Sequence, residues 1–329
     1  MPLDDYNIDK RGNWIPKEQL KPVPIFTFAK PYEILKWIFG WPGYLFPWLT
    51  IYLSICFFSF IYFYPTINGS FQLDLSSAFQ IYLKNLIVIL LIFGGFHIYL
   101  HTFGAQGDDY RYNTKKLQKN NKFWLFKNQT LENIFWTCLS GCLVWSLYEL
   151  FFVWMYANES LNRISFENNP VYYCLLFFLI PIWQVSHFYF SHRLTHVKIL
   201  YKWVHYLHHK NVNTGPWSGL SMHPIEHVLY FSTCLIHFVI PSDLVHVVWH
   251  LMFTGLAPAA GHSGYNEISF KKGGKNSLPH ASYFHYLHHK YFECNYGELL
   301  FPFDKWFGTF HDGTRESGEK IFGSRKLKE

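Results

Sequence analysis

Histidine is the residue whose number and spacing point most clearly to chemistry. The chain has 19 histidines in 329 residues, and 17 of them fall between His187 and His311. Neutral imidazole is a borderline ligand that suits iron, zinc, copper and nickel. The concentration of imidazoles therefore indicates a metal site or a proton-transfer task in the C-terminal part of the chain.

The histidines form ordered clusters with helical spacing. Residues 192–196 read HRLTH, and residues 205–210 read HYLHHK. Residues three and four apart share one face of a helix. The same hexapeptide recurs unchanged at residues 285–290, starting 80 residues later. We therefore expect two helices that present equivalent sets of imidazoles to one centre.

The clusters supply enough donors for two metal ions. Two neighbouring divalent metals need about eight to ten donors when little solvent is available. Clusters of two, three and three, with one further histidine in the segment 261–264, supply nine. The nine candidate ligands are His192, His196, His205, His208, His209, His262, His285, His288 and His289.

Other polar residues are weaker candidates. Glu226 stands between two histidines, and a carboxylate so placed can orient ligand imidazoles. Pro224 interrupts the regular spacing there. Candidates for a ligand or for a partner of a ligand are His223, His227, Glu226, His187, His97 and His101. For His97 and His101 a structural role is the simpler interpretation. Candidates for the wall of a substrate pocket are Trp217 and Met222.

The elements that must position these histidines are membrane helices. Half of the residues are hydrophobic and only 15% are charged, against about 25% charged in an ordinary soluble domain. A membrane span takes about 20 mostly apolar residues. Four runs meet that length: 44–64, 79–103, 132–156 and 170–190.

A fifth apolar stretch, residues 228–257, is broken by Pro241-Ser-Asp243. Each half is about 13 residues, or about 20 Å of helix, against a hydrocarbon core of about 30 Å. The stretch therefore predicts a re-entrant helical hairpin. Two thin crossing segments are the alternative, and they give the same sidedness.

Loop charges predict the orientation in the membrane. Residues 1–43 and 104–131 carry six Lys or Arg each, and the chain after residue 190 carries 14. The loops 65–78 and 157–169 carry one between them. By the positive-inside rule, both termini and the histidine-rich region face the cytosol. Two Asn-x-Ser sequons fall in the two loops assigned to the other side: Asn68 and Asn158.

The fold class predicted is all-α: an integral membrane bundle of four spans plus a re-entrant helical hairpin, with a cytosolic His-rich helical cap. Its expected parts are a cytosolic N-terminal segment (1–43), a transmembrane region (44–190), a catalytic region that includes the hairpin (191–315) and a polar tail (316–329). The net charge of +6 is too small and too scattered to indicate nucleic acid.

Two charged residues lie inside the predicted spans. Lys84, near the start of the second span, is expected to snorkel to the interface. Glu149, within the third span, needs a partner or a cavity.

Five ordered segments carry a family resemblance. They are HFYFSHRLTH (187–196), LYKWVHYLHH (200–209), NTGPWSGLSMHPIEH (213–227), GHSGY (261–265) and HYLHH with NYG and DKWFGT downstream (285–309). In this order they resemble the fatty acid hydroxylase superfamily, in particular its sterol desaturase branch. The resemblance covers about residues 180–315.

The resemblance implies a non-haem di-iron oxygenase of the endoplasmic reticulum with the nine histidines as ligands. Such an enzyme desaturates or hydroxylates a lipid, here a sterol, using O2 and electrons from cytochrome b5 and an NAD(P)H reductase. Family members usually have an acidic residue seven positions before the His192 equivalent. Val185 stands there instead, so that partner is missing or is replaced by His187.

Three alternatives stay open. The nearest is a fatty-acyl or sphingoid-chain hydroxylase. A membrane metal-ion transporter would place its ligands near the bilayer midplane, often in repeated halves, whereas these clusters follow the ends of the spans. A haem electron carrier with two axial histidines would need only a few histidines that face one another within spans. Two irons per chain favour the oxygenase, and a haem optical band favours the carrier.

Overall fold

The computed structural model describes residues 6–27, 29–64, 73–270, 272–273, 277–280 and 282–323. Helices dominate these residues, which confirms the predicted all-α class. The strands of the described part form two short antiparallel pairs. They are β1 (Tyr6–Ile8) with β2 (Trp14–Pro16), and β3 (Glu267–Ser269) with β4 (Ser277–Pro279).

Four continuous helical runs are long and apolar enough to cross a membrane: 75–102, 129–157, 170–195 and 244–261. The first joins α3 (Leu75–His97) to the π-helical η3 (Ile98–Thr102), and the second joins α4 (Gln129–Phe135), η4 (Trp136–Gly141) and α5 (Cys142–Ala157). The other two are α6 (Pro170–Thr195) and α10 (Leu244–Gly261). Exposed apolar side chains on the outer face of α3, such as Leu91 at 68% exposure, suit contact with lipid.

The first predicted span is shorter than expected. Its helix, α2 (Trp48–Phe63), has 16 residues, or about 24 Å of helix. Residues 44–47 form turns that lead into it. Asn68, which begins one of the two Asn-x-Ser sequons, lies outside the described residues.

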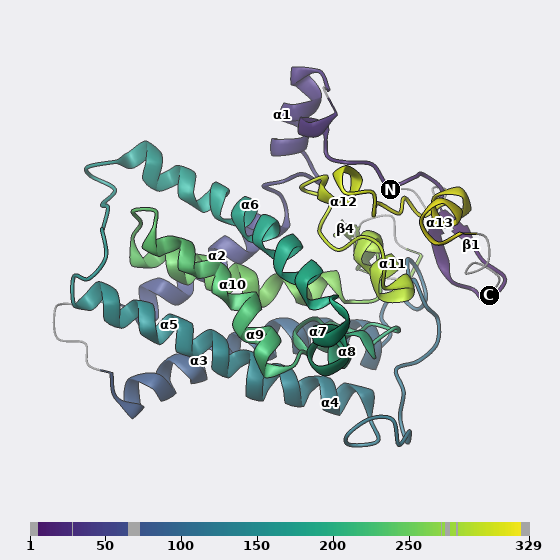
Figure 1. Cartoon of the computed structure of the whole chain (residues 1–329), viewed down its shortest axis with the longest axis horizontal. Helices are drawn as coiled ribbons and strands as arrows, with labels where there is room; N and C mark the ends of the chain where they lie inside the picture. Colours follow the sequence, from purple (N-terminus) through teal and green to yellow (C-terminus); the bar gives the residue numbers. More distant parts are fainter. Residues whose placement is uncertain are drawn as a thin grey trace.

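The apolar hairpin runs deep into the bundle. It descends as α9 (Pro224–Phe231) and η7 (Ser232–Phe238) and returns as α10, which packs against α2, α5 and α6 in the middle of the molecule (Figure 1). At its turn, the phenol of Tyr172 donates to Pro241 O at 3.1 Å, and Arg163 pairs with Asp243 at 2.9 Å. The turn of the helical hairpin thus contacts the loop 158–169.

The short helices gather at the other end of the bundle as a cap (Figure 1). They are α7 (Lys198–Leu200), η5 (Tyr201–His205), α8 (Tyr206–His209), η6 (Pro216–Leu220), α11 (Tyr283–Tyr291), α12 (Phe303–Trp306) and α13 (Arg315–Phe322). The N-terminal η2 (Pro24–Phe26) and α1 (Pro31–Phe39) lie beside this end.

An aromatic cluster fixes the position of α11. Trp14 packs at 6.0 Å from Tyr283, and Tyr112 stacks on Tyr286 at 4.9 Å, both measured between ring centroids. The phenol of Tyr112 also donates to Asn266 at 2.8 Å. The N-terminal segment and the 104–131 loop therefore hold the helix that carries the second hexapeptide.

Lys84 does not snorkel, so that expectation is wrong. It is 2% exposed and forms an ion pair with Glu149 across the interface of α3 and α5. Tyr64 also donates to Glu149, and Asn85 donates to the second carboxylate oxygen at 3.0 Å. The partner that Glu149 needs is therefore a lysine one helix away, which periodicity alone does not reveal.

Candidate metal centre

The structure brings all nine candidate histidines together at the cap end of the bundle. They fall into two groups, and within each group the ligand nitrogens lie within 4.8 Å of one another. The first group is His192, His196, His205, His209 and His288, and the second is His208, His262, His285 and His289. We refer to these as group one and group two.

The two hexapeptides contribute crosswise. In the first copy, His205 and His209 belong to group one, but His208 belongs to group two. In the second copy, His285 and His289 belong to group two, but His288 crosses to group one. The sequence predicts equivalent helices at one centre, and the structure has them exchange one imidazole each between two neighbouring groups.

The imidazoles point their Nε2 atoms at one another. In group one, Nε2 of His196 lies 3.1 Å from that of His205 and 3.2 Å from that of His288. In group two, Nε2 of His262 lies 3.0 Å from that of both His285 and His289. Donors around an ion with metal–nitrogen bonds of about 2.1 Å are about 3.0 Å apart when at right angles. The spacing therefore fits nitrogens that share an ion.

The outward Nδ1 atoms of four ligands have hydrogen-bond acceptors. His192 donates to Tyr296 O at 2.6 Å, His288 to Cys294 O at 2.6 Å and His262 to Pro258 O at 3.2 Å. The fourth, His205, donates to Glu226 Oε1 at 2.7 Å. A proton held on Nδ1 fixes the tautomer in which Nε2 keeps a free lone pair, as metal ligation requires.

The surroundings keep these imidazoles neutral. Burial lowers the pKa of His205, His208, His209 and His288 well below the usual value, and neighbouring imidazoles lower it further. Burial likewise lowers the pKa of His262 to about 3. Nine neutral nitrogen donors in a buried site fit iron, zinc, copper or nickel. All four metals bind imidazole nitrogen, so the donor set is the same for each of them.

Glu226 contacts a histidine of group one, whereas the other weaker candidates make structural contacts away from the two groups. His223 caps α9, its side chain accepting from Ile225 N. His227 bonds Ser140 and Leu220 O, each at 3.0 Å. His187 contacts Ser232 at 3.2 Å and so does not stand in for an acidic residue at position 185.

His97 and His101 stack on each other at 5.4 Å between ring centroids, and His101 also bonds Ser263 O at 2.9 Å. Neither belongs to a group of potential ligands among the described residues. Also outside both groups are His237, His246, His250, His280 and His311.

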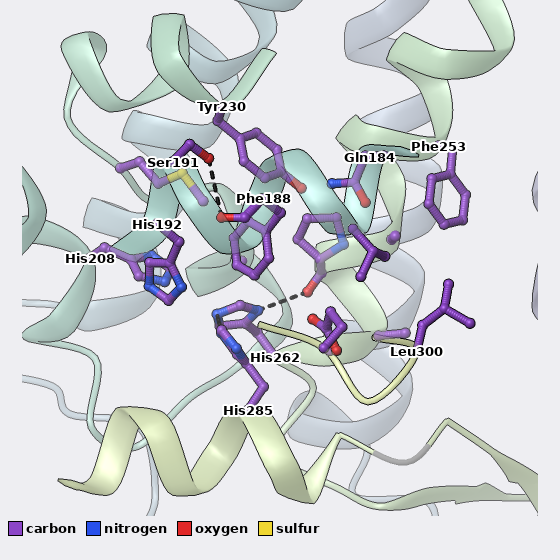
Figure 2. Close-up of a pocket in the computed structure, with 18 of the residues that line it drawn as sticks. Gln184, Phe188, Ser191, His192, His208, Tyr230, Phe253, His262, His285 and Leu300 are labelled. Atoms are coloured by element: carbon purple, nitrogen blue, oxygen red, sulfur yellow. Dashed lines mark hydrogen bonds between the residues drawn. The ribbon is translucent and has the colours of Figure 1, made fainter. Parts of the chain in front are cut away.

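A cavity of about 340 Å³ opens onto the histidines (Figure 2). His192, His208, His262 and His285 form part of its wall, so both groups reach it. Most of the remaining wall is apolar and comes from α2, α6, α9, α10 and the segment 298–300. Its volume is in the range typical of small-molecule sites, about 300–1,000 Å³.

Met222 lines this cavity as expected, but Trp217 is not among the wall residues. Trp217 is buried instead against Phe93, with 5.5 Å between ring centroids. Sequence reasoning missed two polar wall residues, Gln184 and Glu298. Gln184 precedes His192 by eight residues, so both lie on one side of the same helix, a signal that was present in the sequence.

Glu298 has an unusual environment. Burial, together with the charge of Asp304, raises the pKa of its carboxyl to about 7. Asp304 itself accepts from the backbone amides of Tyr296 and Gly297, each at 2.9 Å. These two hydrogen bonds fix the backbone of the segment that directly precedes Glu298.

The fold and site define a class: a membrane helical protein with a buried polyhistidine centre that faces an apolar cavity. In a comparison with known families, residues 176–309 match the fatty acid hydroxylase family. The resemblance of this region to the fatty acid hydroxylase superfamily, in its sterol branch, is thereby confirmed.

Three curated relatives illustrate that branch. The Delta(7)-sterol 5(6)-desaturase ERG3A of Gibberella zeae is 29% identical over 37% of this chain and 34% of its own length. Methylsterol monooxygenase 1 of Gallus gallus is 28% identical over 47% of this chain and 53% of its own. The Rattus norvegicus enzyme of that name is 28% identical over 59% and 66%. The chain therefore spans about a third to two thirds of these relatives. No solved structure matches the chain.

Proposed function

We propose that the chain is a membrane-bound non-haem di-iron oxygenase that desaturates or hydroxylates a sterol. One observation carries the proposal: two groups of four and five imidazoles, built crosswise from a repeated hexapeptide, face one apolar cavity. The nine histidines are the proposed ligands. The curated relatives support a sterol as substrate, because the names sterol desaturase and methylsterol monooxygenase each specify a sterol.

The chemistry requires a metal that changes oxidation state. Two bound irons would supply the redox chemistry that activates O2, which zinc, with a single oxidation state, does not. Desaturation removes two hydrogens from the sterol, and with O2, two electrons and two protons it yields two waters. Hydroxylation leaves one oxygen in the product and yields one water from the same electrons and protons.

The chain's own residues prepare the site for that reaction. Phe188, Leu229 and Phe253 give the cavity apolar walls. Glu226 and backbone carbonyls hold the Nδ1 protons of ligands, so the imidazoles cannot rotate away. A dry, shaped cavity protects a reactive oxidant from side reactions with water.

The proposal includes a location and an electron donor. Both termini and the histidine end would face the cytosol from the endoplasmic reticulum membrane. The donor would be a separate cytochrome b5 that receives electrons from an NAD(P)H reductase. An exposed basic surface near the cap suits an acidic partner of this kind. Its residues are Lys115, Lys116, Lys119, Lys122 and Lys127.

The alternatives fit the geometry less well. Adjacent Nε2 atoms 3.0–3.2 Å apart leave no space for a haem macrocycle between them. A transporter needs ligands along a path through the bilayer, whereas both groups lie at the cap. A fatty-acyl or sphingoid-chain hydroxylase would share the metal centre and differ only in the occupant of the cavity.

The decisive experiment is sterol and fatty-acid profiling of cells with and without the chain, combined with metal analysis of the purified protein. We expect two irons per chain and a sterol that changes by loss of two hydrogens or gain of one oxygen. His208→Ala and His288→Ala should abolish the product while the chain still inserts in membranes. A changed fatty acid with unchanged sterols would favour the acyl hydroxylase, and turnover by either variant would contradict the ligand assignment.

A further inference from the structure

Most polar groups in the cavity wall already have protein partners. Trp48 Nε1 donates to Pro279 O at 2.8 Å, and the phenol of Tyr230 donates to Thr254 O at 2.8 Å. Ser191 donates to Phe188 O at 3.2 Å, a bond drawn in Figure 2. These groups are satisfied without a ligand, so they do not call for one.

Gln184 is different. Its side chain lines the cavity and the residue is 7% exposed, and no side-chain hydrogen bond joins its amide to the described residues. The phenol of Tyr52, also in the wall, has no partner among these residues either. A polar group in an apolar cavity is costly unless a hydrogen bond satisfies it. Because the amide faces the cavity, a molecule inside the cavity is what can complete its hydrogen bonds.

Gln184 stands at the opposite side of the cavity from the metal centre. It precedes His192 on α6 by eight residues, which corresponds to about 12 Å along a helix. Figure 2 has His192 and His208 on one side of the cavity and Gln184 with Phe253 on the other. The ring of Phe188 lies between them. The cavity therefore has a histidine end and a largely apolar middle, and Gln184 supplies the amide at the other end.

We propose that Gln184 binds the hydroxyl group of the sterol and so sets which carbon meets the metal centre. The inference rests on the proposed function. A primary amide both donates and accepts, as a hydroxyl does, so a sterol hydroxyl can accept from the amide nitrogen or donate to the amide oxygen.

The spacing limits where oxidation takes place. The amide and the histidines lie at the two ends of one cavity, about eight residues or 12 Å apart along α6. A sterol whose hydroxyl is held at Gln184 presents its ring system to the histidine end first. Gln184 therefore directs oxidation to the rings near the hydroxyl and away from the sterol side chain.

Binding to the purified chain in lipid nanodiscs tests this role apart from turnover. The probes are a tritiated Δ7-sterol and the same sterol without its 3-hydroxyl. Wild type should bind the hydroxylated probe about fivefold to tenfold more tightly, the effect of one or two net hydrogen bonds. Gln184→Leu and the unbranched Gln184→Met should reduce this ratio to near one. Ser186→Ala is the matched control, since Ser186 bonds Ile182 O on the same helix and is not a wall residue.

The outcomes separate the two proposals. A preference that persists in both Gln184 variants would overturn the inference and leave the sterol oxygenase standing. Failure of wild type to bind either sterol would overturn the proposed function as well. A product oxidised in the side chain by wild type would contradict the positioning role even if the binding preference depends on Gln184.

Discussion

Glu226 accepts a hydrogen bond from His205, with 2.7 Å between Oε1 and Nδ1. Its other oxygen, Oε2, has no partner within the described ranges. Burial raises the pKa of this carboxyl well above its usual value. A cation bound by group one would offset that effect, because positive charge nearby favours the ionised form. Glu226 thus couples the orientation of a ligand to the charge of the site.

Removing this carboxylate should weaken metal binding without removing a ligand. Glu226→Ala is expected to lower iron affinity by about 10- to 100-fold, and Glu226→Gln by less because an acceptor oxygen remains. Iron retained after a timed chelator challenge measures the effect. His223→Ala on the same helix is the control, since it removes a cap and should leave iron retention unchanged. Equal retention in all variants would exclude a role for Glu226.

The crosswise arrangement makes two double variants of one hexapeptide behave differently. His205→Ala with His209→Ala removes two ligands from group one, so one iron should leave quickly and the other should remain. His205→Ala with His208→Ala removes one ligand from each group, so both irons should leave at increased rates. Iron per chain against time in chelator distinguishes a biphasic from a uniform loss.

Lys290→Ala serves as the control for these pairs, because Lys290 is exposed and a protonated amine is a poor ligand. Lys210 is unsuitable, since it pairs with the buried Glu132. Identical release curves for the two double variants would contradict the division into groups.

Glu298 predicts a pH dependence of stability. Its folded pKa of about 7 lies above the unfolded value of 4.5, so the folded state holds the proton more firmly. Below about pH 4.5 the carboxyl is protonated in both states, so Glu298 does not lower the free energy of unfolding of the wild type. This free energy falls as the pH rises through 7. Glu298→Gln should match wild type at pH 4 and exceed its free energy of unfolding at pH 8 by about 1–3 kcal/mol. Melting temperatures at the two pH values test this, and an equal effect at both would refute it.

Gly219 marks a close approach that tolerates no side chain. A Cβ at this position would lie 2.5 Å from Pro258 O, so η6 and α10 would have to separate beside the cavity. Gly219→Ala should cost about 1–3 kcal/mol, as overpacking does. Gly94→Ala is the matched control, because its Cβ would meet Trp217 at an ordinary 3.7 Å. Thermal unfolding in detergent measures both, and equal melting points would contradict the close packing.

The sequence predicts the donor set well because ligand chemistry is local. The two copies of the hexapeptide single out six of the nine histidines that the structure brings together, and the pair in residues 192–196 and the segment 261–264 supply the other three. The crosswise exchange of His208 and His288 depends on how α8 and α11 approach each other, which no local pattern contains. The hydrogen bonds of Nδ1 to carbonyls of Cys294 and Tyr296 likewise belong to loop geometry.

Hydrophobicity predicts which segments are buried in the bilayer but not their depth. The apolar stretch 228–257 predicts a helical hairpin, but the contact of Asp243 with Arg163, which joins its turn to the loop 158–169, has no signal in the sequence. Similarly, an isolated lysine near a span end is expected to snorkel. Lys84 instead finds Glu149 on the neighbouring helix, a tertiary relationship between residues 65 positions apart.

That buried pair provides a test of how the bundle is held together. Removal of one partner leaves an uncompensated charge between α3 and α5, so Lys84→Met or Glu149→Leu alone should cost about 3–5 kcal/mol. The double variant replaces both charges with apolar groups and should recover most of that loss. The ion pair of the exposed Arg163 with the partly buried Asp243 is the control, and Arg163→Ala should cost at most about 1 kcal/mol. Unfolding by increasing detergent measures all four variants, and a double variant as unstable as either single one would show that the cluster with Tyr64 and Asn85 needs its charges.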